Sequence, residues 1–188
     1  MARFAPVVLT CLIAVGGTLR PASAVAADQA RDALAPAPPA ASAGAGEEKA
    51  VIAAVQRFFD TMAACDAAGM RAVLEPEGRF FRLAKGPDGA DAIRNSSNAE
   101  FLARLGPCPE RFLERMWEPQ VRVHQGLATL WAPYDFWRGA TFSHCGIDAF
   151  DLVKTASGWK IVGGAYTVEP EGCAPSPLGP PPAPPAKP

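Results

Sequence analysis

The sequence has almost no excess charge and no long apolar run, and both absences narrow its function. Its 18 Lys and Arg residues are balanced by 19 Asp and Glu residues, which gives a net charge of -1. Bulk electrostatics therefore exclude a basic nucleic-acid-binding protein, and a charged fraction of 20% argues against an acidic disordered chain. No run of about 18 apolar residues is present, so the sequence predicts no membrane insertion.

Histidine is scarce, and the cysteines lack the spacing of a metal site. The two histidines are His124, expected to be exposed near a turn, and His144, and no Cys-x-x-Cys motif occurs. Cys145 directly follows His144, but adjacent residues on a strand point to opposite faces, so the two could hardly bind one ion. The sequence therefore predicts no metal site, and it contains no pattern that requires a cofactor.

The two ends of the chain differ in composition from its middle. Residues 1–27 resemble a secretory signal peptide, with a positive start, a short apolar run and small residues at the cleavage site. Residues 28–46 read as an Ala- and Pro-rich linker, and residues 174–188 as a Pro-rich, disordered tail that acts as an extended spacer. The sequence thus predicts one domain over residues 47–173 and export of the protein to the periplasm or beyond the cell.

The first half of this domain has the apolar spacing of helices. Apolar residues recur three and four positions apart over residues 47–65, which predicts an amphipathic helix. Asp66 is placed to cap a second, short helix that ends near Leu74. Ser97 and Glu100 form a capping box that opens a third helix.

Short β-rich runs separated by turn residues follow the helices. They cover residues 79–83, 111–116, 120–125, 128–137, 142–153 and 159–168, whereas residues 85–95 are expected to form a turn and a loop. Gly139 and Ala140 fit a two-residue hairpin. Helices gathered before strands predict an α+β domain, in which helices cover one face of a single antiparallel sheet.

Four cysteines remain once the signal peptide is removed, and in an exported domain they are expected to form disulfides. Four cysteines allow three pairings. Cys145 lies inside a predicted strand and Cys173 just after the last one, so the two can meet if the chain folds back over the sheet. Cys65 and Cys108, which follow the first and third predicted helices, would form the second bridge. The rival interpretation is a catalytic Cys145 activated by His144.

Several stretches of the sequence resemble nuclear transport factor 2-like domains. They are VIAAVQRFFD at 51–60, LWAPYDF at 130–136, FSHCGIDAFDLV at 142–153, GWKI at 158–161 and AYTVEPEGC at 165–173. The similarity is greatest to an exported bacterial branch described as lumazine-binding-like, and it extends over nearly all of the predicted domain. It implies a curved sheet wrapped into a cone, closed on one side by the long first helix, with a pocket inside. No residue pattern specifies a pteridine ring, so we expect no particular ligand from the resemblance.

The predicted hairpin fixes which residues of the two long strands face each other. If Arg138 pairs with Thr141, Asp135 lies opposite His144, although a bulge would shift this register by one residue. Alternation then places a mixed aromatic and polar set on one face: Trp131, Asp135, Trp137, Phe142, His144, Asp148 and Phe150.

This face supplies the candidate functional residues. Paired with Asp135, the His144 ring would gain proton affinity and act as a proton shuttle near neutral pH. Asp148 is about 13 Å along the strand from His144, so it would line the same cavity at another depth. The candidate catalytic residues are therefore His144, Asp135 and Asp148. The candidate ligand-binding residues are Trp131, Asp135, Trp137, His144 and Asp148, because large aromatics with single polar groups are typical of a pocket.

The alternative is that the same face is the convex, solvated side of the sheet. Asp135 and His144 would then form a surface pair, and the more apolar face, with Tyr134, Phe136 and Ile147, would meet the helices. Arg79 and Arg82 are further candidates, in this case for an anionic ligand.

Three functions follow from these alternatives, and the sequence does not decide whether the protein is an enzyme. The first is an exported domain that binds an unidentified small molecule, with or without catalysis. The second is an isomerase or dehydratase that uses His144 with Asp135 or Asp148 as its proton shuttle. The third is a structural or interaction module that forms a homodimer, as the resemblance allows.

Overall fold

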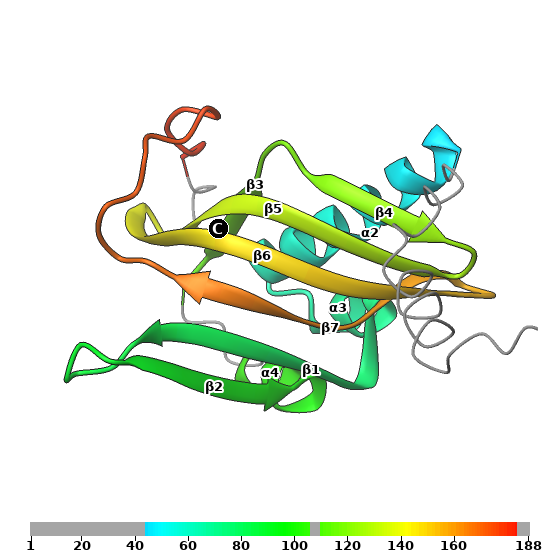
Figure 1. Ribbon diagram of the computed structural model, residues 1–188, viewed down its shortest axis with the longest axis horizontal. Coiled ribbons are helices and arrows are strands. Elements are labelled where there is room, and N and C mark those ends of the chain that lie inside the picture. Colours follow the sequence, from blue (N-terminus) through cyan, green and yellow to red (C-terminus); the bar gives the residue numbers. More distant parts are fainter. Residues whose placement is uncertain (1–43, 106–109, 184–188) are drawn as a thin grey trace, which may run out of the picture. The chain divides into compact units, whose positions relative to one another are not determined.

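The computed structural model describes residues 44–105 and 110–183 of the chain. Three helices and seven strands lie within these ranges (Figure 1). The helices are α2 (Ala45–Ala63), α3 (Ala67–Val73) and α4 (Asn98–Leu105). The strands are β1 (Leu74–Lys85), β2 (Asp91–Ser97), β3 (Phe112–Met116), β4 (Gln120–His124), β5 (Leu127–Arg138), β6 (Thr141–Thr155) and β7 (Gly158–Val168). The predicted signal peptide, most of the predicted linker and Cys108 lie outside the described residues.

The helices begin where their capping residues predict. Asp66 precedes α3, and its Oδ1 atom accepts a hydrogen bond of 2.8 Å from the backbone N–H of Gly69. At the start of α4 the Ser97 hydroxyl accepts from the N–H of Glu100, and the Glu100 carboxylate accepts from the N–H of Ser97. This reciprocal pair confirms the predicted capping box.

The strands form one curved, mixed sheet in the order β2-β1-β7-β6-β5-β3, with β4 also paired to β5. All neighbours are antiparallel except β1 and β7, which run parallel. The predicted wholly antiparallel sheet is therefore wrong at one pairing. The predicted loop up to residue 95 is also wrong, because residues 91–97 form the edge strand β2. An edge strand exposes most of its side chains, so β2 lacks the apolar alternation that marks the other strands.

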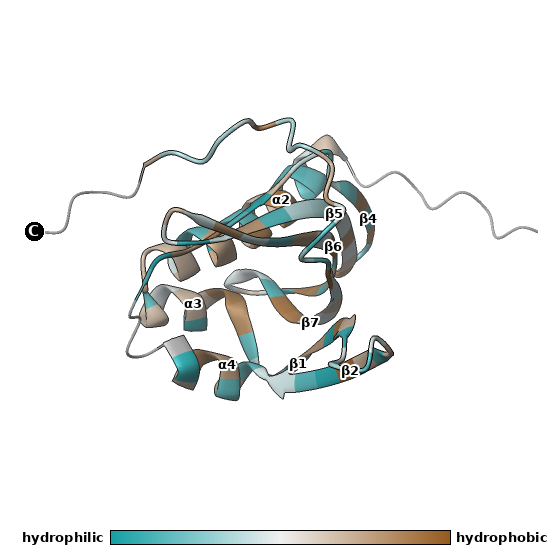
Figure 2. Cartoon of the chain, turned by 90° about the vertical axis from the view of Figure 1, so that its left-hand side faces the viewer, coloured by the Kyte–Doolittle hydropathy of each residue, from teal (hydrophilic) through white to brown (hydrophobic). Residues whose placement is uncertain are grey.

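The helices cover the concave face of this sheet and form the core with it. Figure 2 shows α2, α3 and α4 on one side of the curved strands. Phe58 of α2 lies at the centre of the core, with its ring 5.7 Å from that of Phe101 and 5.8 Å from that of Phe80. The buried residues that α2 contributes are Val51, Val55, Phe58, Phe59, Thr61 and Met62. The predicted α+β class is confirmed.

A bulge in β6 changes the register that the hairpin predicts. The turn pairs form as expected, with Arg138 opposite Thr141, but the register then shifts and leaves Ser143 without an opposite residue. As a result His144 lies opposite Phe136, and the predicted pairing of His144 with Asp135 is wrong. Bulges are common where a sheet curves strongly, and each one moves the following side chains by one position.

The outer face of the sheet carries a disulfide and part of the C-terminal tail. Cys145 of β6 is bonded to Cys173, as predicted, with their Cα atoms 6.0 Å apart. Cys65 is also disulfide-bonded. The tail was predicted to be an extended spacer. In its described part, up to residue 183, it turns back so that Arg115 donates a hydrogen bond of 3.0 Å to the carbonyl oxygen of Gly179.

Candidate functional site

A cavity of about 550 Å³ lies between the helices and the concave face of the sheet. Six phenyl rings line it: Phe58, Phe80, Phe101, Phe112, Phe136 and Phe150. Its polar and charged lining residues are Arg82, Ser96, Arg104, Glu114, Tyr134, Arg138, His144, Asp148 and Tyr166. A volume of this size is typical of pockets for small organic molecules.

The exposure of the lining residues shows which end of the cavity is open. Arg104 of α4 and Arg138 of β5 are exposed to solvent. Asp148 and Phe150 of β6 are only 3% and 4% exposed, and Tyr134 of β5 is 1% exposed. Arg104 and Arg138 therefore lie near the opening, and the Asp148 carboxyl and the Tyr134 phenol lie at the inner end.

Two carboxyl groups, from Glu114 of β3 and Asp148 of β6, lie close enough inside the cavity to share a proton. Two carboxyls can hydrogen-bond only if one carries a proton, because two carboxylates are both acceptors. Burial, and then the negative charge of Asp148, raise the pKa of Glu114 well above its ordinary value. Burial also raises the pKa of Asp148, from 3.8 to about 7, although its hydrogen bond with Glu114 opposes the shift. Near neutral pH the pair therefore holds a proton on Glu114, while Asp148 can gain or lose one.

Asp148 has unused hydrogen-bonding capacity. Within the described residues, its buried Oδ2 atom has no N–H or hydroxyl donor. A buried acceptor without a donor costs free energy, about 1–3 kcal/mol. A ligand that offers a hydroxyl or N–H group at the inner end of the cavity would remove that cost.

Two phenol groups lie beside the carboxyl pair and stay protonated. The Tyr134 hydroxyl donates a hydrogen bond of 2.6 Å to the carbonyl oxygen of Thr167. The pKa values of Tyr134 and Tyr166 are both raised, and burial is the largest cause in each case. Both phenols are therefore neutral hydrogen-bonding groups near pH 7.

His144 lines the cavity but is not a proton shuttle near neutral pH. Its ring stacks on Phe136 at 4.9 Å and meets the edge of Tyr134 at 5.7 Å. Burial, and secondarily the positive charge of Arg82, lower the pKa of His144 from 6.5 to about 4. The predicted increase in its proton affinity is therefore wrong, because the ring is buried and, secondarily, lies near Arg82 and not opposite Asp135.

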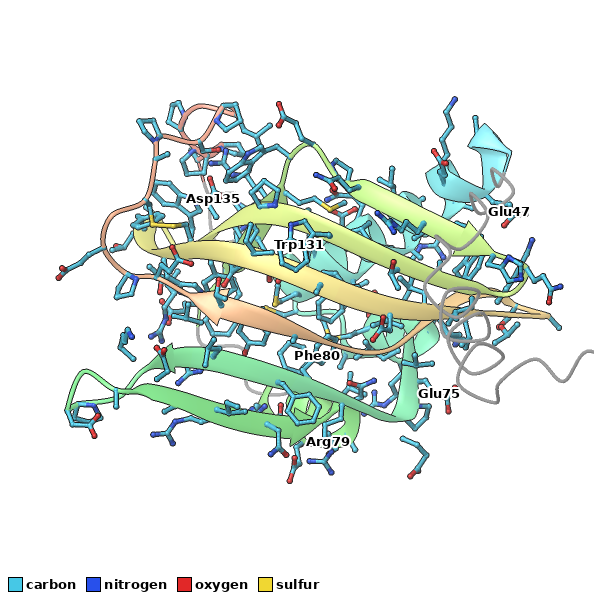
Figure 3. All side chains as sticks on the ribbon, viewed as in Figure 1. Glu47, Glu75, Arg79, Phe80, Trp131 and Asp135 are labelled. Atoms are coloured by element: carbon cyan, nitrogen blue, oxygen red, sulfur yellow. A yellow bond between two sulfur atoms is a disulfide. The ribbon has the colours of Figure 1, made fainter. Side chains whose placement is uncertain are left out.

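The other predicted site residues lie on the outer face of the sheet, away from the cavity. Trp131 is 51% exposed and lies on β5 in Figure 3, on the side of the sheet opposite the helices. Asp135 is buried in an ion pair with Arg115, whose Nε atom lies 2.8 Å from Oδ1 of the carboxylate. Trp137 packs against Phe142 at 5.4 Å. Of the predicted ligand-binding residues, only His144 and Asp148 line the cavity.

Sequence reasoning missed Glu114, although a signal for it was present. Glu114 lies between Phe112 and Met116 on one face of the predicted strand, and an acidic residue between two apolar ones on a buried face is unusual. Arg104 and Tyr166 gave no comparable signal, because their positions in the cavity depend on how α4 and β7 pack against the sheet. Arg82, expected to bind an anion, does line the cavity, whereas Arg79 bonds to Asn95 outside it.

Residues 44–105 and 110–183 hold no group of three or more His, Cys, Asp or Glu side chains that could bind a metal ion. No helix in these two ranges is long and apolar enough to span a membrane.

Comparison with solved protein structures identifies the fold of this chain. No family model matches the sequence, and no curated protein matches it. Solved structures do match. A nuclear transport factor 2-like protein from Cytophaga hutchinsonii is 10% identical and has a TM-score of 0.55, over 65% of this chain and 98% of that chain. A nuclear transport factor 2-like superfamily protein from Salmonella enterica is 14% identical with a TM-score of 0.55, over 69% of this chain and 95% of that chain.

A third match is a candidate dehydratase of the same family from Streptomyces avermitilis. It is 15% identical with a TM-score of 0.51, over 64% of this chain and 94% of that chain. The chain thus has the nuclear transport factor 2-like fold, as the resemblance implies. At these identities the likeness establishes the fold alone, and the exported, lumazine-binding-like branch stays a prediction.

Proposed function

Given the nuclear transport factor 2-like fold of this chain, we propose that the protein is an exported domain that binds a small, largely apolar molecule in its cavity. The observation that carries the proposal is the cavity of about 550 Å³, lined by six phenyl rings around one buried carboxyl pair. Binding sites for small molecules are mostly apolar, with a few polar groups that orient the ligand. The disulfide between Cys145 and Cys173 is compatible with export.

The chemistry of the inner end indicates what such a ligand offers there. Oδ2 of Asp148 lacks a donor among the described residues, and the Glu114 carboxyl already shares a proton with Asp148. A hydroxyl or N–H group on a ring-shaped, apolar body would satisfy the free acceptor. The phenyl rings would stack against the body or meet it edge-on.

A fluorescence titration tests the binding function. N-phenyl-1-naphthylamine is a neutral, apolar probe with one N–H group, and its emission rises when it leaves water. We expect saturable binding to the wild-type protein, lost in Ser96→Trp, because Ser96 lines the cavity and a larger ring would fill it. Thr129→Trp is the matched control, because Thr129 is exposed on the outer face of β5. No binding to the wild type, or equal binding to both variants, would overturn the proposal.

A second candidate function, proton transfer catalysis, is supported by the titration range of Asp148. A carboxylate with a pKa of about 7 can take a proton from a substrate and return it at neutral pH. Once Asp148 has taken the substrate proton, the protonated Glu114 carboxyl would supply a hydrogen bond to the developing negative charge. The isomerase or dehydratase alternative therefore uses Asp148 with Glu114 as its acid–base pair, in place of His144 with Asp135.

Turnover of carbonyl compounds separates the two candidates. An enzyme is expected to convert an enolisable ketone, and Asp148→Asn is expected to abolish that turnover. Probe binding without turnover by the wild type favours a binding protein. If the probe does not bind and the protein is a stable dimer in solution, the interaction module becomes the better interpretation.

A further inference from the structure

The open end of the cavity carries more positive charge than its surroundings neutralise. Arg82 and Arg104 line the cavity, and neither makes a hydrogen bond or an ion pair with any described residue. Glu100, the nearby carboxylate of α4, is engaged with Ser97. Arg138, at the same end, is paired with Glu110. Hydrogen bonds from Ser97 lower the pKa of Glu100, and the charges of Arg79 and Arg104 add to that shift. No carboxylate among the described residues is hydrogen-bonded to Arg82 or Arg104.

The register of β1 and β2 adds a third arginine to this end. Arg94 of β2 lies directly opposite Arg82 of β1, so the two side chains project from the same face of the sheet. Like charges placed directly opposite each other in a sheet are destabilising, and Arg94 has no carboxylate partner within the described residues. A bound anion between the two guanidinium groups would remove the repulsion between them.

Neutral hydrogen-bond donors accompany the arginines. The Ser96 hydroxyl and the Tyr166 phenol both line the same cavity. Arg82 lies opposite Tyr166 in the parallel pairing of β1 with β7. Arg82 also acts on His144, whose pKa it helps to lower, so the positive charge reaches into the cavity. Guanidinium, hydroxyl and phenol groups around one opening are the donors that a carboxylate, sulfonate or phosphate requires.

We propose that Arg82 and Arg104, with Arg94 beside them, form an anion-binding subsite at the opening of the cavity, so that the ligand is an amphiphilic organic anion. Its apolar body would lie among the phenyl rings, and its anionic group would face the arginines. The inference rests on the proposed binding function and adds the charge and the orientation of the ligand. The carboxyl pair at the inner end excludes the reverse orientation, because a second negative charge there would meet the charge of Asp148.

Two probes that differ by a single group test the subsite. 6-(p-Toluidino)naphthalene-2-sulfonate carries its sulfonate at the opposite end of the naphthalene from its N–H group, and N-(p-tolyl)-2-naphthylamine, the neutral probe in this test, lacks only the sulfonate. A comparison of their dissociation constants therefore isolates the anionic group. We expect the sulfonate probe to bind the wild-type protein at least tenfold more tightly than the neutral probe, since hydrogen bonds to charged groups contribute about 1.5–3 kcal/mol. Raising the salt concentration to about 1 M should weaken binding of the sulfonate probe only.

Single substitutions locate the effect. Arg82→Gln and Arg104→Gln are each expected to weaken the sulfonate probe about tenfold or more and to leave the neutral probe within twofold. Arg122→Gln is the matched control, because Arg122 is an exposed arginine on β4 that does not line the cavity. Unchanged affinity for the neutral probe also shows that a variant has kept its cavity.

The outcomes separate this inference from the proposed function. If the neutral probe binds and the sulfonate probe binds no more tightly, or if Arg82→Gln and Arg104→Gln affect both probes equally, the subsite is refuted while the binding function stands. If Arg122→Gln weakens the sulfonate probe as much as Arg82→Gln does, the effect is general surface charge and the subsite is refuted. If neither probe binds the wild-type protein, the binding function fails and the subsite fails with it.

Discussion

Replacing Asp148 with asparagine should change how the stability of the protein depends on pH. Asp148 is 3% exposed, and burial raises its pKa to about 7. Between its ordinary pKa of 3.8 and about pH 7, the folded protein keeps this proton while the unfolded chain releases it. The contribution of Asp148 to the free energy of unfolding therefore falls as the pH rises through this range, and it is lost above about pH 7.

The size of the effect follows from the width of this range. Each pH unit in which only the folded state holds the proton corresponds to about 1.36 kcal/mol. Between pH 5 and pH 8, only the two units from pH 5 to pH 7 lie in this range. The wild type should therefore lose about 3 kcal/mol of stability through Asp148 between the two pH values. The asparagine side chain would accept a hydrogen bond from Glu114 as the Asp148 carboxylate does, but it cannot ionise. The free energy of unfolding of Asp148→Asn, relative to that of the wild type, should therefore be about 3 kcal/mol higher at pH 8 than at pH 5.

The comparison with the wild type is essential because His144 acts in the opposite direction. Its pKa is lowered to about 4, so between about pH 4 and 6.5 the unfolded chain holds a proton that the folded protein lacks. The contribution of His144 to stability is therefore present above pH 6.5 and is lost as the pH falls to 4. In the wild type the two residues partly cancel, whereas the difference between wild type and variant removes the contribution of His144 and reports the carboxyl pair of Asp148 and Glu114.

Urea unfolding followed by tryptophan fluorescence at pH 5 and pH 8 measures this difference. Asp151→Asn is the matched control, because Asp151 lies on the same strand with its side chain exposed. The control should show no comparable change between the two pH values. A difference between Asp148→Asn and wild type that changes by less than about 1 kcal/mol between pH 5 and pH 8 would refute a buried, titrating Asp148.

Two further predictions concern the scaffold. The variant with both Cys145→Ser and Cys173→Ser should lose about 3–4 kcal/mol of stability in non-reducing urea unfolding, because the bridge closes a loop with a sequence separation of 28; an unchanged unfolding midpoint would contradict this. Gly164→Ala should lower the melting temperature strongly, since an added Cβ atom would lie 2.2 Å from the backbone oxygen of Ala149. Gly126→Ala, where the nearest atom is 3.7 Å away, should have little effect, and equal melting temperatures for the two variants would show that the close approach does not constrain the fold.

The sequence predicts this fold well wherever the determining contacts are local. The capping residues of α3 and α4 lie within three positions of the groups they bind, so their hydrogen bonds could be inferred directly. The disulfide between Cys145 and Cys173 could be inferred because one cysteine lies in a strand and the other just after the last strand. Residues 91–95 are predicted to lie in a loop although they belong to β2, because an edge strand does not need apolar alternation.

The candidate site was harder to predict because its residues come from distant parts of the chain. Glu114 and Asp148 lie on strands separated by β5, and their side chains approach each other only across the concave face of the curved sheet. The pKa of His144 depends first on its burial and then on Arg82, which is brought close by the packing of β1 beside β7. Neither contact can be derived from spacing along a single strand, so the sequence could nominate His144 and Asp148 but could not assign their protonation.

The bulge at Ser143 has a consequence for how this protein should be compared with its relatives. Phe142 and His144 are two positions apart, yet Phe142 packs against Trp137 on the outer face while His144 lines the cavity. Loss of Ser143 alone would remove the bulge and make Phe142 and His144 neighbours, so regular alternation would keep His144 and Asp148 facing the cavity. In an evolutionary alignment, a relative without the bulge therefore needs a gap of one residue here, and an alignment without that gap would match His144 and Asp148 with residues that face outward.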